Sequence, residues 1–288
     1  MRSGQRSRSF LAASHFTPDA AALAGCARRG ALGVGYVYHL VSDRRQRDPR
    51  TLWSKADERV GLALMRRFAG VLFTSNDTTA ATLRGRGFDP VHTAVGIELA
   101  SFRQSTLGTS PPRAAFVGRM VRTKGVADAV RAWALVHRSV PDAQLVMVGD
   151  GPERVEGARL CDALEISGVV EWPGFVSEEE KRRILSESRL LLAPSYEEGW
   201  GIAVCEAMAS GLPVVAYRLP VLDSLFDSAY LGATPGAVDE LGQHALRVLT
   251  DDTLADELAR RGRETAARYD IDRVAEDELR VIIARMRG

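Results

Sequence analysis

The stretch A-P-S-Y-E-E-G-W-G-I-A-V-C-E-A-M-A-S-G-L-P-V-V-A, residues 193–216, decides the fold of this chain. The apolar run Leu190–Ala193 predicts a strand, and a Gly-rich turn follows it. Ile202–Ser210 predicts a helix closed by Gly211, and the residues after Pro213 predict a new strand. A strand, a helix and a strand in this order form one step of a parallel α/β sheet.

Two carboxylates stand eight residues apart in this stretch, Glu198 in the turn and Glu206 in the helix. Eight helical steps turn about 800°, which is only ~80° past two full rotations, so both side chains can face one cleft at the mouth of the sheet. The first amides of the helix, near residues 200–203, point at the same place and suit an anion. The stretch therefore predicts a ligand that carries hydroxyls and a phosphate.

The same alternation of strands and helices extends on both sides of this stretch. Residues 114–117, 145–148 and 169–172 predict strands, and each is followed by a Gly-containing loop. Shorter strands are expected in the first hundred residues, and residues 102–113 hold the Ser, Thr, Gly and Pro of an interdomain linker. We therefore predict an α/β protein with doubly wound parallel sheets in two domains, residues 1–105 and residues 106–271.

Composition excludes several classes of protein. The chain of 288 residues is 45% hydrophobic and 26% charged, as in soluble globular proteins, and no apolar run approaches the ~18 residues of a membrane span. The first residues lack the apolar region of a signal peptide, so we expect a cytoplasmic protein. Three isolated cysteines and five scattered histidines match neither a disulfide framework nor a metal site.

Charge is distributed unevenly along the chain. Residues 1–105 carry 16 Lys/Arg and 8 Asp/Glu, whereas the remaining residues carry 22 and 29. The loop D-R-R-Q-R-D-P-R, residues 43–50, is the densest basic segment. A basic first part indicates either a polyanionic acceptor or an anionic membrane surface at which the protein sits peripherally. Arg-rich surface without a partner is the alternative.

Four loops follow predicted strands and should be considered together, because ligands bind beyond the carboxyl ends of parallel strands. The loop from Gly118 to Gly125 offers the cations Arg119 and Lys124 around a tight turn, and Gly149-Asp150-Gly151-Pro152 offers a sharp backbone turn. The third loop, residues 174–176, offers backbone groups beside an apolar wall. The fourth is the opening stretch.

Taken in order, F-V-G-R-M-V-R-T-K-G-V, M-V-G-D-G-P-E, W-P-G-F-V-S and the opening stretch resemble the nucleotide-sugar-binding half of the retaining GT-B glycosyltransferases that carry a Glu-x7-Glu motif. The resemblance implies two Rossmann-like domains that face a cleft, of which residues 106–271 bind the donor. It also implies that the final helix, residues 272–288, crosses back to the first domain.

The resemblance assigns roles to the cations and carboxylates. Arg119 and Lys124, in the loop that starts at Gly118, would hold the donor diphosphate and neutralise its charge as the glycosidic bond breaks. Glu198 would bind hydroxyls of the transferred sugar, and Glu206 would bind those of the ribose. No cofactor is implied, because the nucleoside-diphosphate sugar is the substrate, and the resemblance requires no protein-held metal.

Backbone groups take the remaining implied contacts. The amides of Gly199, Trp200 and Gly201 would contact the sugar and the diphosphate, and Phe175 and Val176 would meet the base. The indole of Trp200 is either a platform for the sugar or a wall between turn and sheet.

The first domain matches the family less specifically, through G-Y-V-Y-H, V-L-F-T-S-N and V-G-I-E-L-A-S-F. By this match His39, at the end of a strand, would lie over the donor sugar. The domain has about 105 residues where about 150 are expected, and no Gly-rich loop precedes His39. Three explanations remain open: a start upstream of Met1, a partner chain or second copy that completes the domain, or a reduced domain.

The function we predict from these observations is transfer of a sugar from a nucleoside-diphosphate sugar to a hydroxyl acceptor, with retention of configuration and without a metal. The alternative is a nucleotide-sugar-binding subunit that is inactive without a partner chain. A nucleotide-sugar epimerase is a weaker alternative, because the acid and base of such an enzyme are not identifiable. The donor base, the sugar and the acceptor are not encoded in these motifs.

Overall fold

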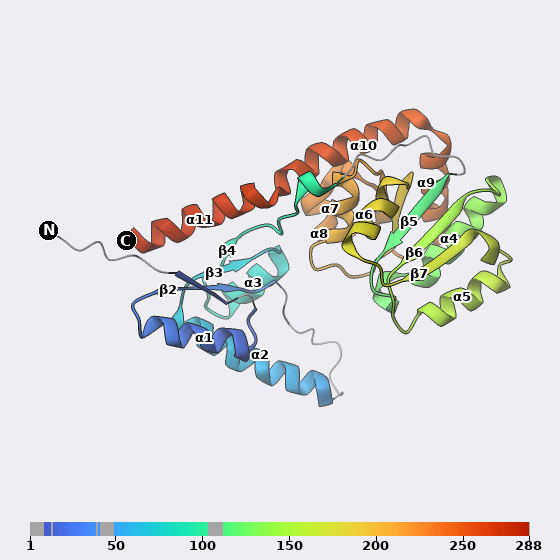
Figure 1. The fold of residues 1–288 in the computed structure, drawn as a ribbon. Coiled ribbons are helices and arrows are strands. Elements are labelled where there is room, and N and C mark those ends of the chain that lie inside the picture. The colour runs from blue at the N-terminus through green and yellow to red at the C-terminus, as the bar shows by residue number, and fades with distance from the viewer. Residues whose placement is uncertain (1–8, 13, 39, 41–48, 103–111, 288) are drawn as a thin grey trace. The chain divides into compact units, whose positions relative to one another are not determined.

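The computed structural model describes residues 9–12, 14–38, 40, 49–102 and 112–287 (Figure 1). The chain forms two compact units, one made of residues 1–96 and 272–288 and the other of residues 97–271. Ile97 belongs to the second unit because its amide bonds to the carbonyl of Tyr269 and its carbonyl accepts from Ile271. The division therefore lies before the residue 105/106 boundary that the linker composition predicts.

The first unit is a four-stranded parallel sheet in the order β1-β2-β3-β4 with helices on both faces. Its helices α1, α2 and α3 connect successive strands, so they lie on one face, and α11 lies on the other. The elements are β1 (Ser9–Ala12), α1 (Thr17–Ala27), β2 (Leu32–Tyr36), α2 (Pro49–Phe68), β3 (Ala69–Thr74), α3 (Asp77–Gly85), β4 (Val91–His92) and α11 (Ile271–Arg287).

Two small cores hold this unit together. On one face, Leu23 of α1, Met65 of α2 and Leu83 of α3 are buried against the sheet. On the other, Ile282 of α11 packs on apolar strand residues, and the carboxylate of Glu278 accepts hydrogen bonds from Tyr36 (2.5 Å) and Thr93 (2.6 Å). The C-terminal helix is thus fixed to the first unit by an apolar contact and by a polar one.

Side-chain caps fix the starts of α3 and α6. At α3 the cap is Asn76 and not the neighbouring Ser75, and the Asn76 side chain accepts from the amide of Thr79 at 2.7 Å. At α6 the cap is Ser177, which accepts from the amide of Glu180. When two residues that can cap a helix are adjacent in sequence, composition alone does not decide which of them is the N-cap.

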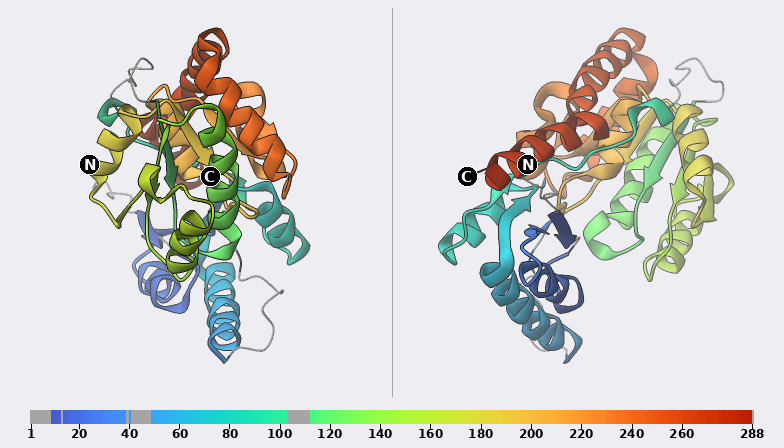
Figure 2. Two further views of the ribbon diagram at one scale, coloured as in Figure 1. Left: turned by 90° about the vertical axis from the view of Figure 1, so that its right-hand side faces the viewer. Right: turned by 60° about the vertical axis from the view of Figure 1, so that its left-hand side comes forward.

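The second unit is a six-stranded parallel sheet in the order β10-β9-β8-β5-β6-β7, with helices on both sides (Figure 2). Together with the parallel sheet of the first unit, it confirms the predicted α/β class. Its strands are β5 (Arg113–Val117), β6 (Gln144–Val148), β7 (Val170–Gly174), β8 (Leu190–Ala193), β9 (Val214–Tyr217) and β10 (Leu231–Ala233). Its α-helices are α4 (Val126–Ser139), α5 (Arg154–Ala163), α6 (Glu178–Ser186), α7 (Ile202–Ala209), α8 (Pro220–Phe226), α9 (Val238–Thr250) and α10 (Asp252–Ala266).

The direction of winding reverses between β5 and β8. After β5 the chain proceeds through α4 and α5 to β6 and β7, and it then returns through α6 to β8 on the other side of β5. Because crossovers are right-handed, α4 and α5 cover one face and α6 and α7 the other. Loops after β5 and β8 therefore lie at a topological switch point, where open parallel sheets bind ligands.

Candidate active site

Main-chain hydrogen bonds join the four loops that follow β5, β6, β7 and β8. The amide of Tyr196 donates to the carbonyl of Thr123 at 2.8 Å, and that of Met120 donates to Asp150 at 2.8 Å. The amide of Gly149 donates to Gly174 at 2.8 Å. These bonds do not depend on side chains, so the loops form one connected floor beyond the carboxyl ends of the strands.

Two glycines allow the close approach of these loops. Gly125 has a left-handed φ of 68°, and a Cβ atom there would lie 2.1 Å from the carbonyl oxygen of Pro194. Gly149 has φ 126°, and its Cβ would lie 1.9 Å from the carbonyl oxygen of Gly118. No other residue fits such positions without moving a backbone. The G-x-G and K-G patterns of the sequence are therefore requirements of loop packing.

Lys124 and Glu198 form an ion pair between the loops after β5 and β8. The Lys124 Nζ atom lies 2.6 Å from Glu198 Oε1, and both side chains are largely buried. An ammonium group has three N–H donors, so Lys124 retains two when one is used by Glu198. The pair can therefore present a cation and a carboxylate to one ligand at the switch point.

Arg119 lies in the same loop as Lys124 and is exposed. Within the described residues no carboxylate pairs with it. In the loop of Glu198, no atom would lie within 4 Å of a Cβ at Gly199, so there is open space beside that loop. A charged guanidinium beside open space is well placed to meet an anion.

Helix α7 begins at this same point. Its N-cap is Gly201, with φ 98°, and no side chain caps its first turn. The first amides of a helix without a side-chain cap are available to a ligand, and the helix dipole favours a negative one. Arg119, Lys124 and the start of α7 therefore give this end of the sheet a positive character.

A second ion pair lies deeper, between α6 and α7. Glu206 is 8% exposed, and its Oε1 atom is 2.8 Å from Nζ of Lys181, which also contacts Glu178 at 2.8 Å. Burial raises the pKa of Glu206, and the bond from Lys181 only partly offsets this. Burial acts to lower the pKa of Lys181, but its bonds to the two glutamates outweigh it and raise the pKa.

The sequence did not single out Lys181. Its place three residues after Glu178 indicates an ordinary pair along one helix face. Its contact with Glu206 depends on α6 lying beside α7, which no local pattern encodes.

Phe175 is 89% exposed although it is a large apolar residue, and Val176 next to it is half-buried. Both lie between the end of β7 and the start of α6, the helix that carries Lys181. An exposed aromatic ring offers a flat apolar surface to a planar ligand group. The predicted contact of these residues with a base stays a prediction.

A buried carboxylate holds the loop that carries Glu198. Asp128 Oδ2 accepts hydrogen bonds from the hydroxyls of Tyr196 (2.6 Å) and Tyr217 (2.9 Å). The bond to Asp128 raises the pKa of Tyr196, and burial followed by the same bond raises that of Tyr217. Both phenols therefore remain donors at neutral pH, and α4 anchors the loop from beneath.

The sequence left two interpretations of the Trp200 indole open, a platform for the sugar or a wall between the turn and the sheet. In the structure it is the wall. Its side chain is 4% exposed and packs edge-on against Phe226 and Tyr269, at ring centroid distances of 5.6 and 4.9 Å. An indole enclosed by two rings offers no face to a sugar. Its backbone remains beside the start of α7, and Cys205 is a buried core residue.

His39 lies outside the described residues, so its predicted place over the donor sugar stays a prediction. Groups of three or more His, Cys, Asp or Glu able to hold a metal do not occur in the described part of the chain. Within the same residues, no helix combines the length and apolar character that crossing a bilayer requires.

Comparison with known sequences places residues 98–265 in the family Glycosyl transferases group 1. The 2-deoxystreptamine glucosyltransferase of Streptomyces kanamyceticus is 33% identical over 158 residues, 54% of this chain and 41% of that protein. The phosphatidyl-myo-inositol mannosyltransferase of Propionibacterium freudenreichii is 31% identical over 219 residues, 72% of this chain and 54% of that protein. The chain thus spans about half the length of these relatives.

Solved structures agree on the fold. The HepE protein of Anabaena in complex with UDP has a TM-score of 0.78 at 18% identity, with 96% of this chain and 79% of that chain covered. Sucrose-phosphate synthase from Thermosynechococcus elongatus has a TM-score of 0.71 at 23% identity, with 90% and 70% covered. Both support the GT-B fold of two Rossmann-like sheets. Because the family pattern covers more than half of its residues, the chain belongs to the group 1 glycosyl transferases.

Proposed function

We propose that this protein transfers a sugar from a nucleoside-diphosphate sugar to a hydroxyl acceptor, with retention of configuration and without a metal. The observation that carries the proposal is the Lys124–Glu198 pair, 2.6 Å apart at the switch point of the sheet. A diphosphate requires positive charge and a sugar requires hydrogen-bond acceptors, and this pair supplies both in one place. The relatives named above, which are glycosyltransferases, and a structural neighbour that holds UDP support this proposal.

In the proposed binding mode, Arg119 and two N–H groups of Lys124 meet the diphosphate beside the start of α7. Glu198 accepts hydrogen bonds from hydroxyls of the sugar, and Glu206 accepts those of the ribose. The ring of Phe175 faces the base. Every group except His39, whose role over the sugar is also part of the proposal, belongs to residues that the structure describes.

In the proposed reaction, the acceptor oxygen forms a bond to the anomeric carbon on the face from which the diphosphate leaves. The bond between that carbon and the phosphate oxygen breaks, and the departing phosphate oxygen takes the proton of the acceptor hydroxyl. Arg119 and Lys124 stabilise the charge that grows on the leaving group, which lowers the barrier because this charge is largest in the transition state. No protein nucleophile is required.

The test uses a panel of uridine, guanosine and adenosine diphosphate sugars. We expect one of them to bind, measured by calorimetry, and to be hydrolysed slowly without an acceptor. Lys124→Met should abolish the hydrolysis, whereas Arg122→Met, which removes an exposed charge from the same turn, should not. If no donor binds, the proposal is wrong. Proton NMR of a transferred product reports whether its anomeric configuration is retained.

A second candidate is a nucleotide-sugar-binding subunit that needs a partner chain. One observation favours it: within the described residues, the edge strands β1 and β4 of the first unit each pair with a single strand, so both edges of this sheet are open to a strand of a partner chain. Donor affinity without hydrolysis or transfer, and activity restored by a co-purifying protein, would support this candidate. Activity of the purified chain alone would exclude it.

A further inference from the structure

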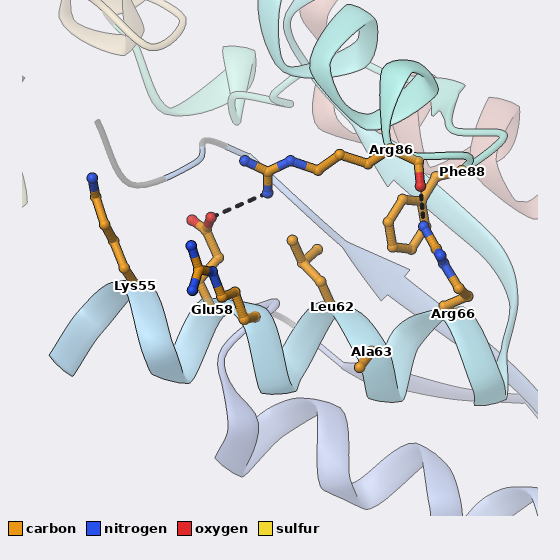
Figure 3. A pocket seen from close by; sticks show the side chains of 8 residues that line it. Lys55, Glu58, Leu62, Ala63, Arg66, Arg86 and Phe88 are labelled. Atoms are coloured by element: carbon orange, nitrogen blue, oxygen red, sulfur yellow. Dashed lines mark hydrogen bonds and ion pairs between the residues drawn. The ribbon is translucent and has the colours of Figure 1, made fainter. Parts of the chain in front are cut away.

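The outer surface of the first unit contains a cavity that the donor site does not use. Its volume is about 600 Å³, and α2 supplies most of its lining, with Arg86 and Phe88 from the segment after α3 (Figure 3). It lies on the side of α2 that faces α3, away from β1, so a strand added beside β1 would not cover it.

The lining of this cavity is strongly basic. Its lining has four cationic side chains and one carboxylate. The cations are Lys55, Arg59, Arg66 and Arg86, and the carboxylate is Glu58. Glu58 is buried and already paired, with Arg86 at 3.4 Å and with His15 at 3.4 Å. The single negative charge is therefore compensated beneath the surface, and the mouth of the cavity keeps an excess of positive charge.

Two of the arginines hold the geometry of the cavity. The guanidinium of Arg66 donates to the carbonyl of Arg86 and lies over the ring of Phe88, 4.7 Å from its centroid (Figure 3). Arg59 is exposed, and within the described residues it has no carboxylate partner. Arg59 is thus the cation of this group that is most available to an external anion.

The same helix exposes large apolar side chains beside the cavity. Leu52 is 56% exposed, Trp53 76% and Val60 51%. At 100° per residue these three positions fall within an arc of about 100°, and Arg59 lies about 20° from its Leu52 end. Helix α2 therefore presents a basic stripe next to an apolar one, where a helix in contact only with water would carry polar groups.

We propose that this face of α2 docks the protein on an anionic phospholipid surface. Leu52, Trp53 and Val60 enter the boundary between headgroups and acyl chains, and the cations of the cavity take lipid phosphates. Both halves of the surface fit this occupant: Trp is favoured at such boundaries, and basic residues are attracted to anionic leaflets. A soluble polyanion would explain the cations but not the exposed Leu, Trp and Val. The proposal does not depend on the proposed reaction.

The experiment is co-sedimentation of the full chain with vesicles of phosphatidylglycerol and phosphatidylcholine in equal amounts, and with phosphatidylcholine alone. We expect binding to the anionic vesicles only, with loss at about 1 M salt, where the Debye length is ~3 Å. Arg59→Ser with Arg67→Ser, which removes two exposed charges from α2, should weaken binding by about fivefold per charge removed. The control pair Arg138→Ser with Arg159→Ser removes two exposed charges from the second unit and should leave binding unchanged.

Tryptophan fluorescence gives an independent measurement, because Trp53 is exposed while Trp133 and Trp200 are buried and Trp172 packs half-buried against the core of the second unit. Anionic vesicles should shift the emission to shorter wavelength, and Trp53→Ser should abolish most of that shift and weaken binding about tenfold.

Four results would overturn the proposal. The first is equal binding to both kinds of vesicle, and the second is an equal loss for the test and control arginine pairs. The third is anionic binding that Leu52→Ser with Trp53→Ser does not change. The fourth is anionic binding that millimolar inorganic phosphate displaces. In the last two cases the surface would be a site for soluble anions.

Discussion

The second unit contains two Lys–Glu pairs that are alike in chemistry and different in setting. Lys124 and Glu198 stand on loops beside open space, at 2.6 Å, whereas Lys181 and Glu206 stand on two packed helices, at 2.8 Å. Loops beside open space can exchange one partner for a ligand at small cost. Helices that share a buried pair keep its atoms in place. The first pair is therefore suited to a ligand whose charge changes during a reaction. The second is suited to holding a ligand in one position.

The largest expected effect comes from removing the cation of the loop pair. Lys124→Met should lower kcat/KM about 1,000-fold, or about 4 kcal/mol, because in the proposed reaction the lost charge acts mainly on the leaving diphosphate in the transition state. Lys181→Met should lower kcat/KM about tenfold through KM, because it perturbs ground-state binding by Glu206. Steady-state kinetics of both variants measures the contrast. Equal losses in kcat would contradict the division of roles.

The next effect concerns the glycine that holds the loop of Lys124 against β8. Gly125→Ala places a methyl group 2.1 Å from the carbonyl of Pro194 at a left-handed φ, which should cost about 3 kcal/mol of unfolding free energy. Gly199→Ala is the matched control, since no atom lies within 4 Å of its Cβ position. Urea denaturation compares the two variants, and similar midpoints would show that the loop relaxes freely.

Sequence reasoning named the two carboxylates of the candidate site but not the residues that contact them, and the reason is physical. It predicted that Glu198 and Glu206 serve one end of the sheet, because helix periodicity and the position of strand ends are local properties. It did not predict Lys181, whose contact with Glu206 spans 25 residues. It also missed Asp128, which lies 68 residues from Tyr196. Contacts of this kind depend on which helices pack together, so the local sequence does not predict them.

Trp200 is a second example in which tertiary packing, and not local sequence, decides the role of a side chain. Its place in the opening stretch is compatible with a ligand platform or a packed wall, and only the surrounding Phe226 and Tyr269 decide between them. Tyr269 is far along the chain and joins the site through the last turn of the second unit. A residue type in a motif therefore predicts position well and side-chain exposure poorly.

The anchor beneath the loop pair should have a smaller effect. Asp128→Asn keeps the shape of the side chain but weakens the bonds from Tyr196 and Tyr217, since bonds to an ionised acceptor contribute about 1–2 kcal/mol more than neutral ones. We expect unfolding free energy to fall by that amount, measured by denaturation. The exposed Asp142→Asn is the control and should change it by less than about 0.5 kcal/mol. If Asp128→Asn left the free energy of unfolding unchanged, the loop would be held by its main chain alone.

The smallest effect is a shift in pH dependence at the helix pair. Burial raises the pKa of Glu206, so this carboxylate takes up a proton at a higher pH than an ordinary glutamate as the solution is acidified. Protonation removes a charged acceptor, and the affinity for the nucleoside diphosphate should fall about fivefold as the pH drops through that raised pKa. Lys181→Met removes the group that opposes the shift, so the pKa of Glu206 should rise further.

The fall in affinity should therefore begin at a higher pH in Lys181→Met than in the parent protein. Calorimetric titration of the nucleoside diphosphate at several pH values measures both curves. Glu178→Gln is the matched control: it removes the other partner of Lys181 and a nearby negative charge, and it should move the curve toward lower pH. If all three curves coincide, the affinity does not depend on the charge of Glu206, and the helix pair only joins α6 to α7. A shift toward higher pH in Lys181→Met, opposite in sign to the shift in Glu178→Gln, would show that the buried pair sets the charge of the carboxylate on which the affinity depends.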